Sequence, residues 1–180
     1  MKKAILEEVE IPEGIECSYE FNFLTCRKGS VELKRQIAIP KIDIFVKKDK
    51  IVFSSLKANK NEKKKIASYT HHLKNMFKGI EEKFVYKLES CNVHFPMTLK
   101  LEGNKLAINN FLGEKIPRYA NIMPGVDVQI KGNLLTVSSH DKEAAGQTAA
   151  NLEKSTRVSK RDRRIFQDGI YITEKPGENK

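Results

Sequence analysis

Hydrophobic and polar residues alternate over much of the chain, which is the pattern of strands with one buried face. The first alternation runs from Ile15 to Cys26, with Tyr19, Phe21 and Phe23 on the apolar side, and it predicts one continuous strand. Further short apolar segments, separated by turn residues, follow at 31–33, 42–46, 51–53, 84–88, 99–101 and 106–111. Their close spacing predicts antiparallel hairpins.

Two segments have the features of helices instead. Apolar side chains recur at three- and four-residue spacing from Ile66 to Ile80, and Asn59 with Glu62 forms the sequence signature of a capping box at the start. A second helix is predicted from about Asp141, and its 144–150 segment consists mostly of alanine and glycine. Such small residues allow a helix backbone to lie unusually close to the sheet beneath it.

An internal repeat sets the domain organisation. The segment 42–55 reappears 84 residues later as 126–139, with the same apolar-Asp-apolar triplet, turn, apolar stretch and pair of serines, and with no gap. A helix is predicted after each copy. We therefore predict an α+β fold of two tandem duplicated domains, 1–82 and 83–180, each an antiparallel β-sheet with one α-helix packed across it.

Composition and charge indicate the kind of partner. The chain has 180 residues, a net charge of +10 and a pI near 9.4, which is typical of a protein that binds a polyanion such as nucleic acid. No apolar run approaches the roughly 18 residues that span a bilayer, and the N-terminus lacks the apolar core of a signal peptide. A cytosolic, soluble protein with no membrane partner is expected.

Candidate chemistry of other kinds is weak. Cys17, Cys26 and Cys91 form no CxxC pair, so reduced thiols are expected, without disulfide or zinc. The segment 138–141 contains Ser, His and Asp, but a catalytic triad depends on spatial geometry and not on adjacency, so a strand end and a helix cap are predicted instead. Clustered carboxylates and glycine-rich phosphate loops are missing from the sequence. We expect no enzyme, no cofactor, no metal and no small-molecule substrate.

The most basic segment lies between the second helix and the last apolar segment. The eleven residues from Lys154 to Arg164 contain six cations and one acid, Asp162. Arginine prevails among the cations, and its planar guanidinium suits two-pronged contact with phosphate oxygens. Aromatic side chains fall mostly on buried strand positions, so recognition of folded RNA through phosphates and 2′-hydroxyls is favoured over base stacking.

Five stretches of the sequence carry a family resemblance: His72–Gly79, His94–Met97, Asn110–Ala120, Asp141–Glu153 and Arg161–Ile172. Together they closely resemble the archaeal and eukaryotic branch of the sixth protein of the large ribosomal subunit. The resemblance implies the same duplicated architecture. It also implies a structural constituent of the large subunit that binds 23S-type rRNA near the stalk base and the sarcin-ricin loop and supports translation.

The same resemblance implies partners and contact residues. The partners are large-subunit rRNA, neighbouring large-subunit proteins and translation factors that dock nearby, in a cytoplasmic ribosome. The second domain is the main rRNA anchor, followed by a short tail. The implied RNA-binding residues are Lys115, Arg118, Lys142, Gln147, Asn151, Lys154, Arg157, Lys160, Arg161, Arg163 and Arg164. The alternative that the charge leaves open is a free basic nucleic-acid-binding protein outside the ribosome.

Overall fold

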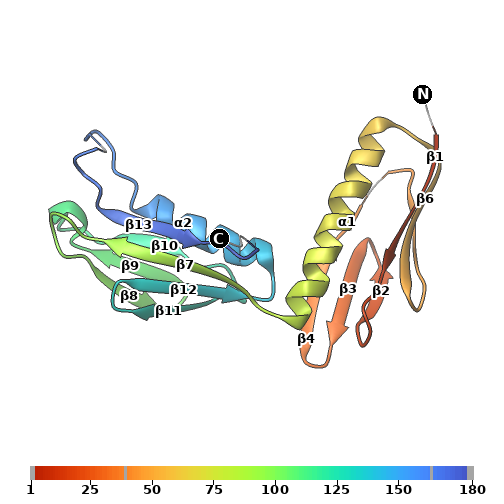
Figure 1. The fold of residues 1–180 in the computed structure, drawn as a ribbon, viewed down its shortest axis with the longest axis horizontal. Coiled ribbons are helices and arrows are strands. Elements are labelled where there is room, and N and C mark those ends of the chain that lie inside the picture. The colour runs from red at the N-terminus through yellow and green to blue at the C-terminus, as the bar shows by residue number, and fades with distance from the viewer. Residues whose placement is uncertain (1–2, 39, 163, 178–180) are drawn as a thin grey trace. The chain divides into compact units, whose positions relative to one another are not determined.

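The computed structural model describes residues 3–38, 40–162 and 164–177 (Figure 1). The chain divides into two compact units, Met1–Glu82 and Lys83–Lys180. The first unit consists of β1 (Lys3–Glu10), β2 (Glu16–Glu20), β3 (Phe23–Lys28), β4 (Val31–Gln36), β5 (Asp43–Val46), β6 (Lys50–Ala58) and α1 (Lys60–Glu81). Its strands form two antiparallel sheets, β1-β6-β5 and β2-β3-β4, and α1 packs on strands of both.

The second unit follows the same order with additions. It consists of β7 (Phe84–Cys91), β8 (Thr98–Glu102), β9 (Lys105–Asn109), the 3-10 turn η1 (Phe111–Gly113), β10 (Arg118–Asn121), β11 (Asp127–Lys131), β12 (Leu134–Ser139), α2 (Lys142–Ser155) and β13 (Gly169–Glu174). The sheets are β11-β12-β7-β13 and β10-β9-β8, all antiparallel. Helix α2 contacts β7, β10, β12 and β13, so it covers strands of both sheets (Figure 1).

The duplication extends to single hydrogen bonds. The order β1-β6-β5 in the first unit matches β7-β12-β11 in the second, and β2-β3-β4 matches β8-β9-β10. The hydroxyl of Ser55 donates to the carbonyl of Lys41 at 2.8 Å, and 84 residues later the hydroxyl of Ser139 donates to the carbonyl of Gly125 at 2.9 Å. The predicted fold class, α+β with a duplicated sheet-and-helix unit, is confirmed.

Each unit has its own apolar core beneath its helix. The largest fully buried side chains of the first unit are Leu24, Ile37, Ile51, Phe53, Ile66 and Leu73. Those of the second unit are Leu88, Leu106, Ile108, Phe111, Leu135 and Leu152. The capping box predicted for α1 is present, with the Glu62 carboxylate accepting from the backbone N–H of Asn59. Helix α1 therefore begins where the sequence predicted. Each helix packs on strands of both sheets of its unit.

One sequence prediction was wrong. The alternating stretch from Ile15 to Cys26 is not a single strand, because the chain turns back at Phe21 and Asn22, whose φ angles are +49° and +65°. Two consecutive left-handed residues make the tight hairpin turn that matches the strand twist, and asparagine accepts this conformation readily. Phe21 therefore lies 92% exposed at the hairpin tip instead of on the buried face.

The three cysteines are free thiols. Cys17 on β2 and Cys26 on β3 pair directly across the hairpin, with their Sγ atoms 3.0 Å apart. The hydrogen bond between the thiols, together with burial, raises the pKa of Cys26. Cys26 therefore behaves as a small apolar core residue.

Candidate nucleic-acid interface

Three loops of the second unit meet at one end of its sheets, and we call segments 92–97, 110–117 and 156–168 together the loop end. The buried carboxylate of Asp168 joins the first to the third. It accepts the backbone N–H of Val93 at 2.8 Å, the backbone N–H of His94 at 2.9 Å and the His94 Nδ1 at 2.6 Å. Asp168 is only 1% exposed. Residues more than 70 positions apart are thereby held in fixed register.

The charge on Asp168 follows from these contacts. Burial on its own raises the pKa of this carboxyl, but the hydrogen bonds from His94 and Val93 favour the ionised form and outweigh burial, so the net pKa is lowered. The carboxylate is therefore ionised at neutral pH. It is a structural anchor, because its hydrogen bonds are made to backbone and side-chain groups of the neighbouring loop.

A ring stack continues from this anchor to the basic segment. The His94 ring stacks on Phe166 with the centroids 4.8 Å apart, and the guanidinium of Arg161 lies 4.9 Å from the centroid of the same Phe166 ring. A guanidinium near an aromatic face is attracted by the ring quadrupole. Arg161 is exposed and yet held by this contact, so its charge is presented to solvent from a defined position.

Arg118 ties the second loop to the third. Its guanidinium donates to both carboxylate oxygens of Glu114 at 2.7 and 2.5 Å, and to the backbone carbonyls of Ser155 at 3.0 Å and Arg157 at 3.3 Å. It also lies 4.3 Å from the centroid of the Phe111 ring. The hydrogen bond from Arg118 lowers the pKa of Glu114 although partial burial opposes this. Arg118 therefore holds the second and third loops of the loop end together.

Helix α2 lies unusually close to the sheet beneath it. Ala145 and Ala149 are fully buried, and a Cβ atom placed on Gly146 would lie 2.9 Å from the hydroxyl of Tyr86 on β7. The close approach predicted from the small residues is thus confirmed. The N-cap is Asp141, whose carboxylate accepts the backbone N–H of Glu143 at 2.9 Å.

The polar residues predicted on α2 form a connected row. Gln147 donates its side-chain amide to Asn151 at 2.8 Å, and Asn151 donates to the backbone carbonyl of Asn121 on β10 at 3.1 Å. Lys154 is exposed in the last turn. Lys142 is at the other end, about 18 Å away along the helix axis at a rise of about 1.5 Å per residue, with its Nζ 5.6 Å from the Phe84 ring centroid.

The remaining predicted cations lie on the loops. Lys115, Arg157 and Lys160 are exposed, and Lys160 has a left-handed φ of +59°. Arg164 donates to Asp162 at 2.8 Å with its own side chain 89% exposed. Arg163 lies outside the described residues. Apart from that position, the structure brings the predicted residues together at the loop end and along α2, with Lys142 alone at the far end of the helix.

The anchors of the loop end were missed by sequence reasoning. Asp168, His94 and Phe166 were not assigned individual roles. Their only signal was their presence in the family-like stretches. The segment proposed to cap α2 behaves as predicted, because Ser139 is bonded to a backbone carbonyl and Asp141 caps the helix.

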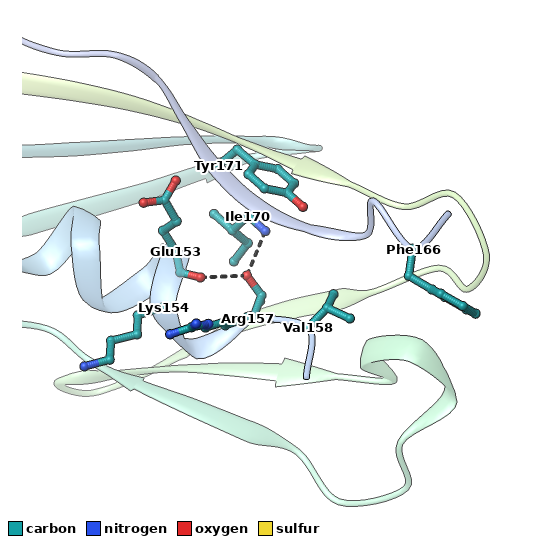
Figure 2. Close-up of a pocket in the computed structure, with 8 residues that line it drawn as sticks. Glu153, Lys154, Arg157, Val158, Phe166, Ile170 and Tyr171 are labelled. Atoms are coloured by element: carbon teal, nitrogen blue, oxygen red, sulfur yellow. Dashed lines mark hydrogen bonds between the residues drawn. The ribbon is translucent and has the colours of Figure 1, made fainter. Parts of the chain in front are cut away.

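A cleft of about 380 Å³ lies beside the basic segment (Figure 2). Its lining comes from the end of α2, the loop that follows and the start of β13: Glu153, Lys154, Thr156, Arg157, Val158, Phe166, Ile170 and Tyr171. In the described ranges, no group of three or more His, Cys, Asp or Glu side chains is placed to hold a metal ion. A search of the same ranges finds no helix suited to crossing a membrane.

Comparisons with known proteins match this sequence to a family. The family model of ribosomal protein L6 matches residues 95–169, a range that covers most of the loop end and all of α2. The large ribosomal subunit protein uL6 of Methanococcus vannielii is 45% identical over 174 residues, which cover 97% of this chain and 96% of that protein. The archaeal source agrees with the branch indicated by the sequence motifs. The chain belongs to the ribosomal protein L6 family.

Proposed function

We propose that this protein is a structural constituent of the large ribosomal subunit and binds large-subunit rRNA mainly through the loop end of its second unit. The observation that carries this proposal is 45% identity, over 97% of the chain, to a protein named for the large ribosomal subunit. The net charge of +10 supports it, because rRNA is a polyanion.

Phosphate contact is the mode that the loop end favours. Arg157, Lys160 and Arg161 are exposed, and within the described residues none of them forms an ion pair with a carboxylate. Each can neutralise a phosphate and release counterions, which strengthens binding in a salt-dependent way. Because Asp168 and Arg118 already hold the loops, binding orders few additional groups and loses little conformational entropy.

The predicted contact residues divide into two roles. Arg118 and Asn151 position the loops and β10, since their donors are engaged by Glu114 and by backbone carbonyls. Direct contacts to RNA come from the exposed side chains, with Gln147 and Lys142 extending the surface along α2. Arg163 is proposed as a contact from its place in the basic segment. The full set of direct contacts is Lys115, Lys142, Gln147, Lys154, Arg157, Lys160, Arg161, Arg163 and Arg164.

The location and partners that we propose are those that the family resemblance implies. We place the protein near the stalk base and the sarcin-ricin loop, beside neighbouring large-subunit proteins and the docking position of translation factors, in a cytoplasmic ribosome. Its role there is architectural: it stabilises folded RNA through backbone contacts and catalyses no reaction.

The test compares two triple variants in cells. The first, Arg157→Ala/Lys160→Ala/Arg161→Ala, removes three exposed cations of the loop end. The matched control, Lys47→Ala/Lys48→Ala/Lys57→Ala, removes three exposed cations of the first unit. Recovery with large subunits after a high-salt wash should fall at least tenfold for the first variant and stay within about twofold for the control, because lost phosphate contacts weaken RNA binding most at high salt.

Two results would contradict the proposal in different ways. A wild-type protein that does not sediment with washed large subunits is a free RNA-binding protein. Normal recovery of the loop-end variant would show that the anchor lies elsewhere on the surface. Circular dichroism of both purified variants should match the wild type, since all six side chains are exposed.

A further inference from the structure

The cleft beside the basic segment has a chemical character that phosphate binding does not explain. Glu153 contributes a carboxylate to its wall, and one oxygen of that carboxylate accepts the backbone N–H of Ile172 at 3.4 Å, whereas Lys154 and Arg157 at the same cleft favour anions. A carboxylate repels a phosphate and instead accepts hydrogen bonds from N–H groups. A ligand suited to this cleft therefore carries N–H donors for the carboxylate and an attached anionic group for the two cations.

The floor of the cleft suits a flat apolar group. Val158 and Ile170 are buried side chains that line it, and the ring of Tyr171 stands at one side (Figure 2). The guanidinium of Arg157 lies on another side of the same space (Figure 2). Aromatic rings and guanidinium planes are the surfaces on which unstacked RNA bases are held.

Hydrogen bonds within the protein fix the walls of the cleft. The hydroxyl of Thr156, which is 3% exposed, donates to the Glu153 carbonyl at 3.1 Å and accepts the Ile170 N–H at 2.9 Å (Figure 2). The Tyr171 hydroxyl donates to the Gln167 carbonyl at 3.2 Å. These bonds fix the end of α2 to β13, so the walls need little rearrangement on binding.

Size limits the occupant to one residue of a partner. About 380 Å³ is near the lower end of the range for small-ligand sites, and a double helix is far too wide to enter. Sequence-specific contacts to RNA mostly involve bases turned out from loops, bulges and ends. A single base turned out of the stack, with its own phosphate at Lys154 and Arg157, fits the size of the cleft and its combination of apolar, acidic and basic groups.

We propose that this cleft binds one unpaired base of the RNA, with the base edge against Glu153 and its phosphate at the rim. The donor pattern favours guanine, whose Watson–Crick edge carries adjacent N1–H and N2–H groups. The Glu153 carboxylate keeps acceptor sites for both groups besides the one that accepts the Ile172 N–H. This inference rests on the proposed rRNA-binding function and adds a base-reading contact to an interface that otherwise binds the RNA backbone.

The experiment uses Glu153→Gln, which keeps the shape of the side chain and replaces one acceptor oxygen with a donor. The matched control is Glu102→Gln, the same change at an exposed residue of β8. Large subunits containing wild-type or variant protein are probed with kethoxal, which modifies the Watson–Crick edge of unpaired guanine, and with hydroxyl radicals, which report contacts to the RNA backbone.

The expected result is one guanine that the wild type protects and that becomes roughly tenfold more reactive with Glu153→Gln, the effect of losing one specific base contact. Its backbone footprint should persist, and Glu102→Gln should change neither signal. A backbone footprint with no guanine exposed by Glu153→Gln would overturn the base-binding proposal alone. Density for a side chain of a neighbouring protein in the cleft would also overturn it, whereas a missing footprint would contradict the rRNA-binding function itself.

A second measurement covers the case in which Glu153→Gln is not incorporated. The isolated full-length protein is titrated with guanosine 5′-monophosphate and followed by the amide resonances of Glu153 and Ile170 in NMR spectra. Both resonances should shift in the wild type and stay unchanged in the variant. Unchanged resonances in the wild type would count against the proposal.

Discussion

The two units share a scaffold and differ in what is added to it. Both have the same order of strands in two antiparallel sheets, and both bury a serine hydroxyl against a carbonyl at equivalent positions. In the first unit β3 and β4 are joined by the two residues Gly29 and Ser30, whereas in the second unit β9 and β10 are joined by the segment 110–117. The second unit also adds a long basic loop and β13 after its helix. The core thus maintains the fold, while the additions carry the proposed function.

The largest effect should come from breaking the anchor that only the second unit has. Asp168→Ala removes a buried carboxylate and leaves two backbone N–H groups and the His94 ring without their acceptor, which should lower the stability of the second unit by about 3 kcal/mol. Asp162→Ala, which removes an exposed carboxylate, should leave the stability of both units nearly unchanged. Residue-resolved urea denaturation by NMR measures each unit separately. An equal loss in both units would contradict the local role of Asp168.

The contribution of Asp168 to the stability of the second unit should depend on pH. Since the folded-state pKa of Asp168 is lowered, its contribution to stability is complete above the ordinary Asp pKa of about 3.9 and is lost as pH falls through the lower folded value. The stability difference between wild type and Asp168→Ala should therefore be constant from pH 7 to pH 5 and shrink below about pH 4.

Removing the serine hydroxyl that both units share should have an intermediate effect on stability. Ser55→Ala and Ser139→Ala each remove one hydroxyl that donates to a carbonyl, at 2.8 and 2.9 Å, from residues that are 8% and 4% exposed. Each should destabilise its own unit by about 1 kcal/mol and leave the other unit unchanged. Hydrogen exchange resolves the two units. Because the Ser139 hydroxyl also accepts the Asp141 N–H at 3.2 Å, its loss should be somewhat the larger. No loss in either unit would contradict a stabilising role for the shared hydrogen bond.

The smallest effect concerns the close contact of α2 with β7. Gly146→Ala gains helix propensity of about 1 kcal/mol but places a Cβ 2.9 Å from the Tyr86 hydroxyl, so we expect a net loss of up to about 1 kcal/mol. In the Tyr86→Phe background the same substitution should become stabilising by about 0.5 kcal/mol. Thermal unfolding of the four proteins in this cycle measures the coupling. Without coupling, the hydroxyl is not the group that limits the helix approach.

Much of the fold could be predicted because its signals are local or periodic. The spacing from Ile66 to Ile80, the capping residue Asn59 and the repeat at 42–55 and 126–139 each lie within a short stretch. The hairpin at Phe21 and Asn22 was missed because Phe21 continues the apolar alternation although its side chain is exposed. Strand β10 was missed as well, since Ala120 is its one buried residue and four residues give no clear period.

The candidate site could be predicted only in part for a related reason. A run of arginines is visible in the sequence, so the basic segment was found. The contact between His94 and Asp168 joins residues 74 positions apart, and no pattern connects them. Arg118 was predicted to bind RNA. Its contacts with Glu114 and with two backbone carbonyls could not be predicted, because they depend on how the loops pack in the folded unit. Such polar contacts arise from the tertiary fold and follow no sequence period.

The pairing of β13 with β7 also determines when the basic segment takes its shape. Gly169 lies opposite Cys91 in that pairing, so the strands that meet are 78 positions apart, whereas β2, β3 and β4 are consecutive hairpins. Closing such a long loop is slow compared with forming a local hairpin. During synthesis the first unit can fold while the second is still being made, and the arginines acquire their final arrangement last. Late completion would keep this cationic surface unformed until the rest of the second unit has folded.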